Sequence, residues 1–130
     1  MTNTVKKAAY WTQFMAYRSE LRSGPLLLEH FKAGKITRLC DCGCNSYDIE
    51  VPADVGLAPL LPESGRGGHA FELEFYTGEE HRTIGIAVFV TDRGYLAGID
   101  VNYCANSYPM PDVPTIVEPP FNVIGVLKNE

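Results

Sequence analysis

The pattern of apolar and polar positions changes at Gly34. Before it, apolar residues recur at the spacing of one helix face, which predicts a helix over residues 5–22. The positions that carry this pattern are Tyr10, Phe14, Tyr17 and Leu21. The stretch "SGPLLLEHFKAG" predicts a second helix over residues 25–33, because Pro25 suits the first helical position and Gly34 ends the helix.

After Gly34 the apolar residues recur every second position, which is typical of strands. Residues 47–51, 71–75 and 97–103 each have one apolar and one polar side. The segment "TIGIAVFV" is apolar at both parities and predicts a central strand covered on both faces. "TDRGY" predicts a hairpin turn with Gly94 at positive φ, so residues 83–91 and 95–103 are expected to be antiparallel neighbours.

Two segments are predicted to lie outside regular strands. Residues 57–68 contain a cluster of prolines and glycines, which is typical of a loop. Five prolines between residues 109 and 120 remove ladder donors, so that segment is expected to lie extended over the surface. The whole pattern predicts one domain over residues 1–130. Its predicted class is α+β, with two N-terminal helices packed on a mainly antiparallel sheet of about four to six strands.

Composition and charge limit the function classes. The longest apolar run is far shorter than the roughly 20 residues of a membrane helix, and the N-terminus lacks the apolar core of a secretory signal. We therefore expect a cytoplasmic protein without membrane association. Residues 1–39 have seven Lys and Arg against two acids, whereas residues 40–130 have four against fourteen. The acidic majority disfavours nucleic acid and favours a basic partner, although it also serves solubility.

Three of the four cysteines, Cys40, Cys42 and Cys44, lie within five residues, and the fourth is Cys104. In the cytoplasm these thiols are expected to be reduced. The C-x-C-x-C spacing is not the C-x₂₋₄-C spacing of structural zinc sites. Gly43 suggests a bend, beside which small thiols pack as weak hydrophobes. Structural thiols are therefore the favoured interpretation, a metal module is the alternative, and a redox switch is the third.

Catalytic motifs are absent from the sequence. It contains no phosphate loop, nucleophile elbow or H-E-x-x-H helix, and "GRGG" is too short to bind phosphate. A Cys–His pair formed by Cys104 or the cysteine cluster with His69 or His81 is the one nucleophilic arrangement left, and sequence alone cannot bring these residues together. We predict a protein that is not an enzyme and that needs no cofactor or metal.

The polar sides of the predicted strands carry the strongest functional signal. Parity places acids together on one side of their strands, and five of them could line one face of the sheet. Like charges gathered in this way are destabilising, so a basic protein partner would compensate them. A merely solvated outer face is the alternative. The candidate partner-binding residues are Asp48, Glu50, Glu72, Glu74 and Asp100.

The stretches "CDCGCNSYDIEV" and "HRTIGIAVFVTDRGYLAGIDVNY" resemble a group of small bacterial proteins. The shared features are C-x-C-G-C-x-S at a strand start, a D-x-G turn and a strand of the type L-x-G-[IL]-[DE]-[IV]. The matching residues are Cys40, Cys42, Gly43, Cys44, Ser46, Asp92, Gly94, Leu96, Gly98, Ile99, Asp100 and Val101. Some members resemble immunity proteins encoded beside secreted or contact-dependent toxins. The resemblance implies a cytoplasmic protein that binds and neutralises a cognate toxin domain, for which a basic nuclease is one candidate.

Overall fold

The computed structural model describes residues 3–40, 44–61, 67–79, 81–104, 107–111 and 114–129, which form two helices and six strands. The predicted α+β class, with two N-terminal helices on a mainly antiparallel sheet, is confirmed. The elements are α1 (Val5–Ala16), α2 (Gly24–Ala33), β1 (Lys35–Leu39), β2 (Tyr47–Glu50), β3 (Gly68–Thr77), β4 (Thr83–Val90), β5 (Leu96–Tyr103) and β6 (Ile116–Ile124).

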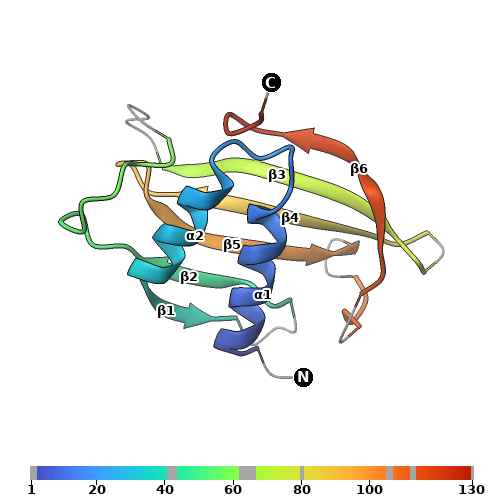
Figure 1. Ribbon diagram of the computed structural model, residues 1–130. Helices are drawn as coiled ribbons and strands as arrows, with labels where there is room; N and C mark the ends of the chain where they lie inside the picture. The colour runs from blue at the N-terminus through green and yellow to red at the C-terminus, as the bar shows by residue number, and fades with distance from the viewer. Residues whose placement is uncertain are drawn as a thin grey trace.

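The strands form a single sheet in the order β1-β2-β5-β4-β3-β6, and every neighbouring pair is antiparallel. Both helices lie side by side across the same face of this sheet (Figure 1). The predicted hairpin between β4 and β5 is confirmed. Gly94 has a φ of 84° and its N–H donates to the Thr91 carbonyl at 2.9 Å.

Helix α1 is shorter than the residues 5–22 that the sequence predicts, and it buries a different stripe. It ends at Ala16 and buries Trp11 and Met15, while Tyr10 and Tyr17 are exposed. Beyond the helix, the Arg18 guanidinium lies over the Phe14 ring, and Leu21 forms an isolated bridge with Lys128. The apolar residues that continued the helical pattern therefore serve a turn and a contact with the C-terminal segment.

Alternate strand residues complete the core beneath the helices. Phe71, Leu73 and Phe75 of β3 are fully buried, and the Phe75 ring meets that of Phe14 edge-on at 5.6 Å. The corresponding residues of the neighbouring strands are Tyr47, Ile49, Ile84, Ile86, Val88, Ile99, Val101 and Tyr103. One hydrophobic layer thus fills the space between helices and sheet.

Two buried polar side chains connect the helices to the sheet. The Thr12 hydroxyl on α1 lies 2.6 Å from the Tyr47 hydroxyl on β2. On α2, His30 Nδ1 accepts from the Leu96 N–H at 3.2 Å and Nε2 lies 2.8 Å from the Ala58 carbonyl oxygen. Because Nδ1 is an acceptor here, Nε2 carries the proton and donates it to Ala58. These bonds fix the helices against β2 and β5.

The sequence suggests that the proline-rich segment lies outside the sheet, but part of it forms a strand. Residues 116–124 pair with β3 as β6, at the edge of the sheet, and this strand includes Pro119 and Pro120. An edge strand tolerates proline because one side of its backbone has no ladder to complete. No helix within the described ranges is both long and apolar enough to cross a membrane.

Candidate functional site

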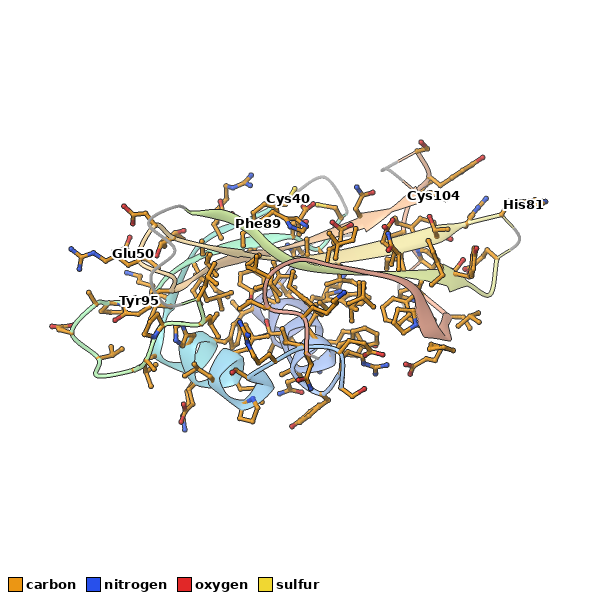
Figure 2. The ribbon with its side chains drawn as sticks, turned by 90° about the horizontal axis from the view of Figure 1, so that it is seen from above. Cys40, Glu50, His81, Phe89, Tyr95 and Cys104 are labelled. Carbon is orange, nitrogen blue, oxygen red and sulfur yellow. The ribbon has the colours of Figure 1, made fainter. Side chains whose placement is uncertain are left out.

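The sheet face opposite α1 and α2 is the candidate site, and we call it the open face. Figure 2 shows both helices on one side of the sheet and Phe89 on the other. In β2 the core residues alternate with exposed Asp48 and Glu50, and β3 shows the same alternation. The polar and charged residues of the open face include Lys35, Arg38, Asp48, Glu50, His69, Glu72, Glu74, Asp100, Asn102 and Asn122.

The five acids predicted from parity therefore lie on the open face. Strand order brings three of them close to the middle of the sheet, around β4. Glu72 on β3 and Asp100 on β5 are both register partners of Ala87, one from each side. Glu74 is paired with Gly85, one alternation further along β4. Their positions agree with the prediction, whereas their role in binding stays a prediction.

Four of the five acids make polar contacts within the protein. Asp48 Oδ2 accepts from Arg38 Nε at 2.8 Å, and Asp100 Oδ1 accepts from the Ser46 hydroxyl at 2.8 Å. The other two contacts are 2.9 Å from Glu72 Oε1 to His69 Nε2 and 2.8 Å from Glu74 Oε1 to Asn122 Nδ2. A carboxylate has about four acceptor positions, so these contacts orient the acids without exhausting them.

Two positive side chains of β1 lie beside these acids: Arg38 is the register partner of Asp48, and Lys35 is that of Glu50. The hydrogen bond from Arg38 to Asp48, followed by the charge of that carboxylate, raises the pKa of the Arg38 guanidinium. Both side chains are more than half exposed, which limits what this ion pair contributes to stability. The pair neutralises part of the charge at one end of the open face and leaves the centre acidic.

The sequence pattern did not reveal an exposed aromatic pair on the open face. Tyr76 of β3 and Phe121 of β6 stack with ring centroids 4.4 Å apart, and they are 55% and 44% exposed. Val117 and Ile124 of β6 are also exposed and lie opposite Tyr76 and Glu72 in the register. Because the prolines suggested that this segment forms no regular strand, the sequence did not predict on which face of the sheet its apolar residues lie.

The prediction that both faces of β4 are covered is wrong. Helices cover only the face of Ile84, Ile86 and Val88, and the other parity of β4 belongs to the open face. The open-face positions of β4 read as apolar because they include the small residues Gly85 and Ala87. A Cβ built on Gly85 would lie 2.9 Å from Glu72 Oε2, so the longer side chain of the neighbouring strand leans over it.

The cysteine predictions have mixed outcomes. Cys44 is disulfide-bonded, so the expectation that all four thiols are reduced is wrong for this residue. That expectation rested on the redox state of a compartment, whereas pairing depends on the approach of two sulfur atoms. Cys42 and Gly43 lie outside the described residues, as does the bend expected at Gly43. Among the described residues, no group of three or more His, Cys, Asp or Glu side chains is placed to hold a metal ion.

The structure separates Cys104 from His69, one of the two histidines suggested as its partner. Cys104 Sγ accepts from the Thr83 N–H at 3.4 Å, at one end of β4. His69 packs against Phe89 at the other end of β4, six residues or about 20 Å away. His81 lies nearer, and the Cys104 thiol donates to its backbone carbonyl oxygen, 4.0 Å from Sγ. The distance along β4 therefore rules out a pair of Cys104 with His69.

Comparison of the chain with protein-family models, with curated proteins and with solved structures gives no match. We therefore base the functional argument on the open face itself.

Proposed function

We propose that this protein binds a basic protein partner through the open face and that the partner is a cognate toxin domain, which the protein neutralises as an immunity protein. The observation that carries the proposal is the position of Asp48, Glu50, Glu72, Glu74 and Asp100 on the sheet face opposite the helices. We further propose that the protein acts in the cytoplasm and by binding rather than catalysis.

Interface chemistry supports a protein partner for this face. Interfaces commonly combine an aromatic centre with a polar or charged surround, and the exposed Tyr76–Phe121 stack lies beside Glu74 and Asn122. A nucleic acid would meet like charge here, because its phosphates and the five acids are all negative. A basic protein surface matches both parts of the open face. The resemblance seen in the sequence adds the expectation that the basic partner is a toxin domain.

The decisive experiment begins with the neighbouring genes. A gene for a large secreted toxin directly upstream would supply the C-terminal toxin domain for co-expression and for binding kinetics. We expect this protein to rescue growth of cells that express the toxin domain. We also expect the association rate to fall as salt rises from about 50 to about 300 mM, because screening weakens electrostatic steering.

A pair of charge-reversal variants tests the face. Glu72→Lys with Glu74→Lys should slow association roughly tenfold while the free protein stays folded. The matched control is Glu29→Lys with Asp54→Lys, which changes the net charge equally at exposed positions of α2 and of the loop after β2. Equal association rates for the two double variants, or a toxin that the protein does not neutralise, would contradict the proposal.

A further inference from the structure

A small hollow lies on the open face between β2 and β5. Its volume is about 270 Å³, and its lining includes Arg38, Ser46, Asp48, Phe89, Gly98 and Asp100. Gly98 creates the space, because it is the register partner of both Asp48 and Phe89 and has no side chain to fill it. A Cβ at this position would lie 2.4 Å from the Tyr47 carbonyl oxygen. The close approach of β2 and β5 therefore requires glycine at position 98, and the missing side chain leaves the hollow open.

Two carboxylates flank the hollow at positions where one cation can reach both. Asp48 is opposite Gly98, and Asp100 follows Gly98 by two residues on the same face of β5. Such diagonal neighbours are roughly 7 to 8 Å apart, too far to form a directly opposed repulsive pair. The separation suits a bridging group with several hydrogen-bond donors.

Each carboxylate is held in place by a neighbouring side chain. Ser46 accepts from the Val101 N–H at 2.9 Å and donates to Asp100 Oδ1 at 2.8 Å, so a buried hydroxyl fixes Asp100. Arg38 fixes Asp48 and cancels part of its charge. Asp100 thus supplies most of the attraction for an incoming cation.

Phe89 supplies an apolar wall. Its ring meets the His69 ring edge-on at 5.6 Å and 87°, and His69 in turn contacts Glu72. Aromatic faces attract arginine side chains, whose guanidinium plane stacks on the ring while its N–H groups bond to carboxylates. The hollow therefore combines the two features that guanidinium recognition uses.

We propose that this hollow receives an arginine side chain from the protein partner, an inference that rests on the proposed function of the open face. Arginine fits better than lysine because its five donors form a rigid fork that can serve Asp48 and Asp100 together. An apolar side chain would cover Asp100 without supplying a charge to compensate it, because Arg38 pairs with Asp48. The arginine would anchor one end of the interface, away from the Tyr76–Phe121 stack.

The proposal can be tested without the toxin, with Nα-acetyl-arginine methylamide as the probe. In a titration followed by amide NMR, the probe should cause saturable shifts at Gly98 and Asp100, and the lysine analogue should bind several-fold more weakly. Asp100→Asn keeps an oxygen that can accept from Ser46 but loses the charge, so it should weaken arginine binding roughly threefold to tenfold. Phe89→Leu keeps apolar bulk, removes the π face and should reduce the preference for arginine over lysine.

Glu50→Gln is the matched control. Glu50 carries the same charge on the same strand as Asp48 but does not line the hollow. Equal weakening by Glu50→Gln and Asp100→Asn, equal shifts with arginine and lysine probes, or no saturable shift would overturn the arginine site. Those results would leave the proposed function to its own kinetic test. If the hollow prefers the arginine probe but toxin association is unaffected by charge reversal at Glu72 and Glu74, the arginine site would stand and the proposed role of the acidic open face would be rejected.

Discussion

At the scale of single residues, the Tyr47 hydroxyl shows how the helices hold the sheet. Thr12 Oγ1 lies 2.7 Å from the Ala8 carbonyl and donates its only proton there, so Tyr47 donates to Thr12. Burial raises the pKa of Tyr47 above its usual range. The folded protein therefore holds this proton more tightly than the unfolded chain, whose tyrosines ionise near pH 10.

This difference predicts a loss of stability at alkaline pH. The contribution of Tyr47 is complete below about pH 10 and declines as the pH rises above that value, because the unfolded state then releases its proton first. Tyr47→Phe should cost about 1 kcal/mol at neutral pH through the lost hydrogen bond and should flatten the alkaline decline. Urea unfolding from about pH 7 to about pH 11 measures both effects.

The exposed residue Tyr17 provides the control for this series. Tyr17→Phe should match the parent protein in stability and in pH dependence, since this side chain is 75% exposed. If Tyr47→Phe kept the full alkaline decline of the parent, another group would have to account for it.

The cysteines give a second prediction at the residue scale, on metal content. A cysteine must be reduced to a thiolate before it can bind zinc, and Cys44 is disulfide-bonded. Protein purified without reductant should therefore contain much less than one zinc per chain, and a chelator should leave its melting temperature unchanged. Elemental analysis and thermal unfolding with and without chelator test this.

A reductant series separates the remaining interpretations of the cysteine cluster. Protein reduced in the presence of zinc and then dialysed should release the metal, because C-x-C-x-C is not the usual spacing of a structural site. One zinc per chain that survives dialysis and whose removal unfolds the protein would establish the metal module that we rank second.

At the scale of elements, the approach of the two helices depends on Gly24. A Cβ on Gly24 would lie 2.0 Å from the Ala16 carbonyl oxygen, so the first residue of α2 packs directly on the last residue of α1. Gly24→Ala should force the helices apart and cost about 2 to 3 kcal/mol in chemical unfolding.

Gly34→Ala is the matched comparison, since Gly34 also lacks a positive φ. Its added Cβ would lie 2.7 Å from Ile49 Cδ1 and 2.8 Å from Ile49 Cγ1, both side-chain atoms, while the nearest backbone atom, the His30 carbonyl oxygen, is 3.1 Å away. We expect a cost of about 1 kcal/mol or less. Equal costs for the two substitutions would show that backbone contact between the helices does not limit their packing.

The elements themselves were largely predictable because their signals are local. The alternation in residues 47–51 and 71–75, and the glycine of the hairpin turn, depend on neighbours only a few positions apart. The end of α1 was predicted too late because Leu21 contacts Lys128, which is distant in sequence. The proline-rich edge strand β6 was missed for a similar reason, since its partner β3 lies about 40 residues earlier.

At the scale of the whole molecule, the candidate site also combines features with local signals and features that depend on contacts between distant residues. Parity could place the acids on one side of each strand, because successive side chains point to opposite faces. Parity could not bring Glu72 and Asp100 to either side of Ala87, since that requires the order β5-β4-β3. The hollow around Gly98 and the Tyr76–Phe121 stack also depend on pairing between distant strands.

Gathering like charges on one face should lower the stability of the free protein and favour its complex. Glu74 and Asp100 allow a clean test, because their hydrogen bonds from Asn122 and Ser46 need an acceptor oxygen rather than a charge. Glu74→Gln with Asp100→Asn keeps both oxygens. We expect the double variant to be more stable than the parent by a few tenths of a kcal/mol per charge at low salt. The gain should shrink at high salt as screening weakens the repulsion that it relieves.

The same double variant should associate more slowly with the toxin domain, so stability and binding should move in opposite directions. Urea unfolding at low and high salt measures the first effect, and stopped-flow mixing with the toxin domain measures the second. A loss of more than about 1 kcal/mol in the free protein would show that the two charges stabilise the fold, because a removed repulsion can only raise stability. Their position on the open face would then follow from packing of the sheet, and the argument that a partner must compensate them would fail.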